Sequence, residues 1–164
     1  MILVLVCVAL NAQIQPTLTV RLYPQGQNTD LGIVENGVAI TLGPGESNGL
    51  TGPEECAENG NISNINDEAR LDIYIPADCN GQMVINCPGG GYLINSSYNE
   101  GSRAADWFAA RGIACCVVKY RIPNQHRTVP LTDVQNAFRY CRAHAAEWGV
   151  RQIGVMGYSA GGHL

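Results

Sequence analysis

The sequence has little charge and almost no lysine. Charged residues make up 15% of its 164 residues, the net charge is −4, and Lys119 is the only lysine. Proteins that bind nucleic acid usually carry a basic face, and this sequence has no basic run. We therefore expect no nucleic-acid partner. With 46% apolar residues the chain can still bury a core, so its composition is that of a folded globular protein.

The sequence also lacks an apolar run long enough to cross a bilayer, which takes about 20 residues. Residues 1–10 are continuously apolar, which is the length of the apolar part of a signal peptide, and Ala12 is a small residue suited to cleavage. No basic residue precedes the run, and a buried strand is the alternative. We expect residues 1–12 to be the remnant of a signal peptide, which implies an exported protein, periplasmic or extracellular.

Metal-binding spacings of cysteine and histidine are absent, so we expect no metal and no cofactor. In an exported protein, cysteines can form disulfides, and Cys56–Cys79 is the one pair we consider. Four further cysteines lie in apolar strand or helix patterns, where a free buried thiol is the simpler interpretation: Cys87, Cys115, Cys116 and Cys141.

Residues 13–65 are rich in Gly, Asn and Pro, and we expect an irregular leader that lies against the domain. Two stretches within it, residues 17–23 and 38–42, could form strands. Residues 66–164 are predicted to be the N-terminal part of the folded domain, because the pattern there changes to alternating strands and helices.

Within residues 66–164, strands are predicted at 70–76, 83–88, 113–118 and 153–156, and helices at 102–111 and 132–148. The first strand alternates polar and apolar residues, as a half-buried edge strand does, and the third is apolar throughout, as a strand buried on both faces is. This order predicts an α/β fold, a three-layer sandwich with helices on both faces of a mostly parallel sheet.

The ends of the two helices carry local signals. Ser102 is a candidate N-cap for the first helix, and Gly112 is expected to end it. Asp133 is expected to open the second helix, where a carboxylate favours the positive end of the helix dipole. Gly149 is expected to end that helix.

Residues 157–161 read Gly-Tyr-Ser-Ala-Gly, which fits the G-x-S-x-G pattern. The pattern follows an apolar strand and opens a helix, and this context is the test for a nucleophile elbow. The elbow exposes its serine on a tight, strained turn, so Ser159 is predicted to be the catalytic nucleophile, with Gly157 and Gly161 leaving room for close packing. The alternative is a glycine-rich turn with a solvated serine.

A second glycine motif, residues 87–92, reads Cys-Pro-Gly-Gly-Gly-Tyr and follows the second predicted strand. Glycines let the backbone approach a developing negative charge, so we predict an oxyanion hole built from the N–H of Ala160 and one from Gly90 or Gly91. The alternatives are a tight turn or a phosphate-binding loop. The dinucleotide pattern G-x-G-x-x-G fails at Ile94, and no Walker pattern with a lysine is present.

Short motifs of the last hundred residues carry a family resemblance; they lie at residues 88–92, 114–121, 133–135, 147–149 and 154–164. This stretch resembles the bacterial exported α/β-hydrolases of the acetyl-xylan-esterase-like type. The resemblance implies an α/β-hydrolase fold and metal-free hydrolysis of carboxylic esters, often acetyl groups on plant polysaccharide. A sister group of lipases and esterases has His where this chain has Pro88. That difference leaves the oxyanion role untouched, because the role uses backbone.

In this fold the acid and the histidine of the triad follow the nucleophile in the chain. We therefore expect both to lie beyond Leu164, and we expect the 164-residue polypeptide alone to be inactive and, with an uncovered sheet edge, prone to aggregation. His163 is four residues after Ser159 and is expected to point along the helix. His144 is expected to be partly exposed, and His126 to lie in a loop at the surface or at the substrate rim.

Three other functions remain open from the residues alone. A serine peptidase of the same fold shares the elbow, and a non-catalytic carbohydrate-binding or structural module could retain it. A nucleotide-binding α/β domain is disfavoured by the failed glycine patterns.

Overall fold

The computed structural model describes residues 14–23, 34–35, 38–39, 50–66 and 68–164. The predicted signal remnant, residues 1–12, lies outside the described residues. Of the second predicted leader strand, only β3 (Val38–Ala39) is described, paired with β2 (Val34–Glu35). Among the described helices, none is long and apolar enough to cross a membrane.

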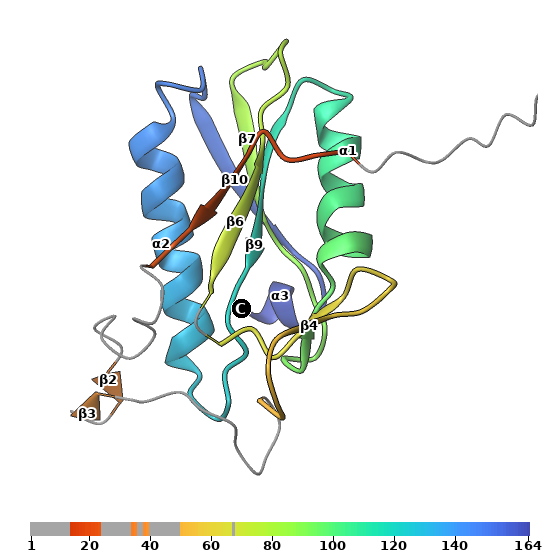
Figure 1. The fold of residues 1–164 in the computed structure, drawn as a ribbon. Helices are drawn as coiled ribbons and strands as arrows, with labels where there is room; N and C mark the ends of the chain where they lie inside the picture. The colour runs from red at the N-terminus through yellow and green to blue at the C-terminus, as the bar shows by residue number, and fades with distance from the viewer. Residues whose placement is uncertain (1–13, 24–33, 36–37, 40–49, 67) are drawn as a thin grey trace, which may run out of the picture.

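The main sheet has five strands in the order β1-β6-β9-β7-β10 (Figure 1). Their bounds are β1 Leu18–Arg21, β6 Arg70–Tyr74, β9 Ala114–Lys119, β7 Gln82–Cys87 and β10 Gln152–Gly157. Strands β9, β7 and β10 run parallel, as expected for an α/β fold. Strand β6 is antiparallel to β9, and β1 is antiparallel to β6, so the described sheet is mixed.

Strand β6 is not the half-buried edge strand that its alternating sequence predicts. It lies between β1 and β9, and four of its five residues are buried. Its polar residue Asp72 is satisfied inside the structure, because Thr19 on β1 donates a hydrogen bond to it at 2.8 Å and Lys119 on β9 forms an ion pair with it. Of the two stretches of the leader that could form strands, residues 17–23 contain β1.

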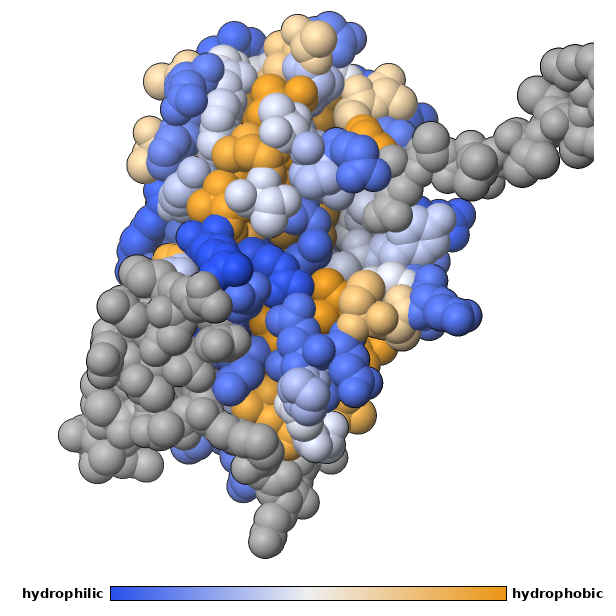
Figure 2. All heavy atoms as spheres, in the orientation of Figure 1, coloured by the Kyte–Doolittle hydropathy of each residue, from blue (hydrophilic) through white to orange (hydrophobic). Residues whose placement is uncertain are grey.

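Two helices cover opposite faces of this sheet and complete the expected three-layer sandwich. They are α1 (Arg103–Ala109) and α2 (Thr128–His144), seen on either side of the strands in Figure 1. Residues 114–118 of β9 are all apolar because the strand packs against helices on both faces. Cys116 and Val118 join the cluster that includes α2 residues, whereas Cys115 and Val117 join the cluster that includes α1 residues. In the space-filling view, apolar residues gather along the middle and hydrophilic residues lie mostly at the sides (Figure 2).

The helix starts differ from the predicted ones. A π-helix, η1 (Ser97–Ser102), precedes α1, so Ser102 is already helical and does not cap through its side chain. Helix α2 begins at Thr128, four residues before the predicted start, with Pro130 in the first turn, where proline is tolerated. Asp133 therefore lies in the second turn. Gly112 adopts a φ of 69°, as a helix-ending glycine does.

A three-stranded sheet of β4 (Glu55–Cys56), β5 (Ile62–Ser63) and β8 (Ile94–Asn95) lies beside the main sheet. The disulfide considered between Cys56 and Cys79 is wrong, since both thiols are free. Cys56 is exposed on β4, whereas Cys79 belongs to the turn between β6 and β7 at the opposite end of the molecule (Figure 1).

Candidate active site

Ser159 occupies the turn between β10 and the short helix α3 (Ala160–His163). Its φ is 47° and its ψ is −116°, a region that residues other than glycine rarely adopt. The side chain is exposed. Such strain persists only where the surroundings enforce it, and it is concentrated at functional sites. The turn therefore holds a serine hydroxyl at the carboxyl end of a parallel strand.

Two glycines of the turn make close backbone contacts that a side chain would block. A Cβ on Gly157 would lie 2.4 Å from the oxygen of Gly161, and a Cβ on Gly161 would lie 2.0 Å from the oxygen of Cys87. The turn is closed by the N–H of Gly161, which donates to the oxygen of Tyr158 at 2.7 Å. The spacing of glycines around Ser159 is thus a packing requirement of the strand–turn–helix unit.

The glycine loop lies directly beside this turn. Strands β7 and β10 are parallel neighbours with Cys87 opposite Gly157, so the segments that follow them leave the sheet together. A Cβ on Gly89 would lie 3.1 Å from the Cβ of Ser159. The structure therefore brings together the two glycine motifs that the sequence separates by about 70 residues.

Three backbone N–H groups of the two glycine motifs have no partner in the part of the chain that the structure describes. Within the described residues, the N–H groups of Gly90, Gly91 and Ala160 donate to no other residue. Gly90 and Gly91 have φ values of 131° and 63°, and the oxygen of Gly90 accepts the N–H of Ile94 at 3.1 Å. Fixed, unpaired donors of this kind can stabilise negative charge as it develops next to a nucleophile.

The start of the glycine loop is fixed from three directions. The hydroxyl of Tyr120 donates to the oxygen of Pro88 at 2.6 Å, and burial raises the pKa of Tyr120, so this donor stays protonated. The N–H of Ser96 donates to the oxygen of Gly89 at 3.0 Å. The N–H of Gly89 donates to Glu100 Oε2 at 2.7 Å.

Sequence reasoning missed Glu100 as a contact of the site. Tyr120 belongs to a motif of the family resemblance, and that was its only signal. Glu100 carries none, because it reaches the loop through the irregular η1 segment.

His144 and His126 occupy the positions expected from the sequence, whereas His163 points across to the glycine loop and not along its helix. His163 faces Tyr92, and His163 Nδ1 lies 2.8 Å from the Tyr92 hydroxyl. His144 is half-buried on α2 and stacks between Tyr140 and Trp148. His126 lies in the loop before α2. Among the described residues, the hydrogen-bond partner of His163 Nδ1 is the Tyr92 hydroxyl and that of His144 Nδ1 is the Tyr140 oxygen.

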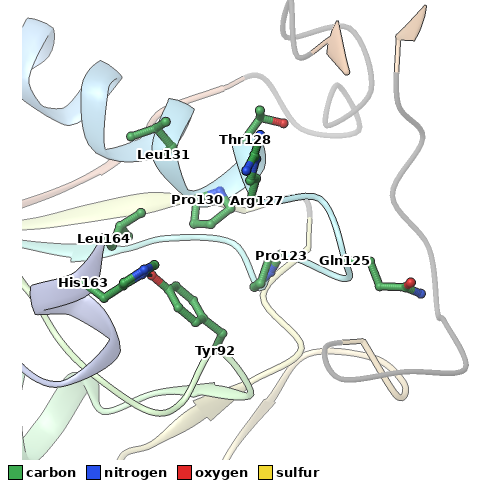
Figure 3. A pocket seen from close by; sticks show the side chains of 9 residues that line it. All are labelled: Tyr92, Pro123, Gln125, Arg127, Thr128, Pro130, Leu131, His163 and Leu164. Atoms are coloured by element: carbon green, nitrogen blue, oxygen red, sulfur yellow. Dashed lines mark hydrogen bonds between the residues drawn. The ribbon is translucent and has the colours of Figure 1, made fainter. Parts of the chain in front are cut away.

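A cavity of about 610 Å³ opens beside the Tyr92–His163 pair (Figure 3). Both side chains point into it, and its walls are largely apolar and proline-rich. The lining side chains come from the glycine loop, the loop before α2, the first turn of α2 and α3: Tyr92, Pro123, Gln125, Arg127, Thr128, Pro130, Leu131, His163 and Leu164.

Asp133 has a different role from the predicted one at a helix N-terminus. It is wholly buried and paired with Arg121, which is also wholly buried, with Arg121 Nη2 at 2.6 Å from Asp133 Oδ1. The backbone N–H of Arg121 and the hydroxyl of Tyr23 also donate to this carboxylate, each at 2.8 Å. The pair ties the end of β9 to α2 and so holds the neighbouring Tyr120 in place. In the part of the chain that the structure describes, no group of three His, Cys, Asp or Glu residues could hold a metal.

Comparisons with known proteins identify a family and several relatives. The BD-FAE family model matches residues 71–164. An acetylxylan esterase from Xylanibacter ruminicola is 41% identical over 105 residues, which are 62% of this chain and 22% of the relative. The chain thus spans about a fifth of the length of the curated relative it matches.

Two solved structures are also similar. An acetyl ester-xyloside bifunctional hydrolase from Caldicellulosiruptor lactoaceticus has a TM-score of 0.60 and 21% identity, over 93% of this chain and 46% of that one. A propionate-bound thermophilic esterase, Est2, from Thermogutta terrifontis has a TM-score of 0.51 and 32% identity, over 58% and 38%. The first likeness concerns the fold alone. Because the family model covers more than half of its length, the chain belongs to the BD-FAE family, and its fold is that of the α/β-hydrolase esterases.

Proposed function

We propose that the protein is a serine hydrolase of carboxylic esters with Ser159 as its nucleophile. The observation that carries the proposal is the strained, exposed Ser159 packed against a glycine loop in which the N–H groups of Gly90 and Gly91 have no partner among the described residues. An ester hydrolase needs a nucleophile and an oxyanion site within contact distance of one another, and this arrangement supplies both kinds of group.

The proposed reaction has two steps. Ser159 Oγ attacks the ester carbonyl carbon while its proton passes to a histidine that follows the nucleophile in the chain, and the alcohol then leaves with that proton. Water hydrolyses the resulting acyl-serine in the same way. In both steps the oxyanion accepts the N–H of Ala160 and that of Gly90 or Gly91, and loss of one such donor typically costs about 2.7–4 kcal/mol.

The proposed substrate class is acetylated xylan-type polysaccharide or a related acyl ester. The 41% identical relative is named an acetylxylan esterase, and Est2 of T. terrifontis has been solved with propionate and with butyrate bound. Short acyl groups are thus common to the relatives. Neither the peptidase nor the non-catalytic module is favoured by a specific observation.

We also propose a domain organisation that is consistent with an exported esterase. Residues 1–12 are the remnant of a signal peptide, residues 13–65 a leader that supplies β1, and residues 66–164 the N-terminal part of the hydrolase domain. Export would bring the enzyme to a polysaccharide that is outside the cell.

The test uses the full-length protein, acetylated xylan and p-nitrophenyl acetate. Ser159→Ala should lower kcat by several powers of ten, whereas Ser63→Ala, on the separate three-stranded sheet, should leave it unchanged. Paraoxon, which phosphorylates the T. terrifontis esterase, should add one adduct to the Ser159 peptide. An active Ser159→Ala variant would contradict the assignment, and peptide cleavage without ester cleavage would favour a peptidase.

A further inference from the structure

We propose that Glu100 is a positioning residue for this reaction. Its carboxylate holds the glycine loop in the conformation that keeps the N–H groups of Gly90 and Gly91 beside Ser159. The inference rests on the proposed esterase function and adds to it a residue that neither glycine motif contains.

The backbone of Glu100 is set by the η1 π-helix, an irregular form that is frequent at functional sites. The next residue, Gly101, packs so closely on β9 that a Cβ there would lie 2.9 Å from Val117 Cγ1. Asn86, wholly buried on β7, donates to the oxygen of Glu100 at 2.6 Å. The main chain at Glu100 is therefore fixed against the neighbouring strands β9 and β7.

The side chain of Glu100 then reaches back to the loop. Its Oε2 accepts the N–H of Gly89 at 2.7 Å, which is the length of a charge-assisted hydrogen bond. Gly89 lies between Glu100 and the nucleophile, because a Cβ on it would be 3.0 Å from Glu100 Oε2 and 3.1 Å from Ser159 Cβ. The carboxylate thus acts on the oxyanion donors through one peptide unit and does not need to touch substrate.

The loop needs such an anchor because three successive glycines have many backbone conformations available. The Pro88 and Gly89 carbonyls are held by Tyr120 and by the Ser96 N–H. The Gly89 N–H is held by Glu100 alone among the described residues. Without the Glu100 acceptor, the Pro88–Gly89 peptide keeps only the hydrogen bond from Tyr120 and can tilt about it. The N–H groups that follow at Gly90 and Gly91 then lose their alignment with the oxyanion.

The central experiment compares Glu100→Ala, Glu100→Gln and Glu147→Ala in the full-length protein with p-nitrophenyl acetate. Glu100→Ala should lower kcat 10- to 100-fold with KM within twofold of wild type, because the donors act mainly in the transition state. Glu100→Gln keeps an acceptor oxygen at the same place and should stay within fivefold of wild type. Glu147→Ala, an exposed change beyond the end of α2, should have no effect.

A merely structural role would lower stability without separating alanine from glutamine in kcat, so thermal unfolding is measured on all variants. Should Glu100→Ala not fold, Glu100→Asp replaces it, since the shorter side chain keeps the charge but falls short of Gly89. A Glu100→Ala kcat within twofold of wild type, or a Glu100→Gln kcat as low as that of the alanine variant, would overturn the proposal.

Hydrogen exchange of residues 88–92 separates this inference from the esterase proposal. Glu100→Ala should raise the exchange rate of the Gly89 N–H at least tenfold, and Glu147→Ala should not, whether or not the protein hydrolyses esters. Unchanged exchange would refute the anchoring role of Glu100. A wild-type protein that hydrolyses no ester and is not labelled at Ser159 would refute the esterase function instead.

Discussion

Ser159 has a left-handed φ of 47°, and the backbone packed around the turn holds it in that conformation. Such a conformation costs about 1–3 kcal/mol, and it is maintained by the packing of Gly161 against the Cys87 carbonyl and of Gly157 against Gly161. The glycines next to the nucleophile therefore act on geometry, and their replacement should change stability as well as rate.

Gly161→Ala tests this packing. Its Cβ would lie 2.0 Å from the backbone oxygen of Cys87, and neither backbone can yield without moving β7 or the turn. We expect a loss of about 3 kcal/mol in the free energy of unfolding, the upper part of the range for overpacking, measured by urea denaturation. Gly162→Ala is the control, because its Cβ would be 3.2 Å from the nearest atom, the Gly157 oxygen, and should cost about 1 kcal/mol or less. Equal losses would contradict the packing argument.

A second prediction for single residues concerns the buried Arg121–Asp133 ion pair. Asp133→Ala would leave the wholly buried Arg121 guanidinium without its carboxylate, which should cost about 3–5 kcal/mol. Tyr23→Phe removes only the hydroxyl that donates to Asp133 and should cost about 1 kcal/mol. Denaturation curves of the two variants, with the exposed change Glu147→Ala beside them, check this order. A loss below 1 kcal/mol for Asp133→Ala would show that water or another side chain replaces the pair.

At the scale of elements, the apolar strands of the sheet were the most predictable part of the chain. The segments that became β7, β9 and β10 are continuous or nearly continuous apolar runs, and such runs depend little on their neighbours. The edge position predicted for β6 was wrong, because the partners of Asp72 come from β1 and β9, which are distant in sequence. A polar residue in an alternating strand can face solvent or be buried in an ion pair, and the sequence pattern is the same in both cases.

The candidate site was predictable only where local sequence determines local geometry. A G-x-S-x-G turn after a strand needs no distant residue to be recognised, and neither does a glycine loop. The η1 segment has no comparable pattern, since a π-helix arises from packing against β9, and so the contact of Glu100 with Gly89 could be seen only in the structure. Asp133 was misplaced for the same reason, because its partner Arg121 belongs to another element.

The elements also set the reactivity of the cysteines. Cys56 is exposed on β4, whereas four other thiols are buried in the sheet and in α2. We expect iodoacetamide to modify Cys56 in the native protein within minutes and the four buried thiols only after unfolding, as mapped by mass spectrometry of the peptides. Cys56→Ser should abolish the fast phase at that site. Rapid native labelling of Cys115 or Cys116 would mean that β9 is not packed on both faces.

For the whole molecule, burial of weak acids in one core links stability to alkaline pH. Desolvation raises the pKa of Cys87 and of Cys115 from 9.0 to about 12. It also raises the pKa values of Tyr74 and Tyr120, with nearby acidic groups adding to the effect. All of these groups are neutral in the folded protein at neutral pH. If one of them lost its proton while the protein was folded, its negative charge would lie inside the core.

The folded protein holds these protons more tightly than the unfolded chain does, so the stabilisation is fully present below pH 9 and is lost as the pH rises from about 9 towards 12. At pH 10.5 each of the two thiols should lower the free energy of unfolding by on the order of 1–2 kcal/mol relative to pH 8. Urea midpoints at a series of pH values measure this decline in stability.

Cys115→Ala removes one titrating group and should make the dependence of the midpoint on pH shallower, whereas Cys56→Ser, at an exposed site, should leave that dependence unchanged. A midpoint that stays constant from pH 8 to pH 11 would mean that water reaches the sheet interior between α1 and α2, and that the three-layer packing around β9 is open in solution.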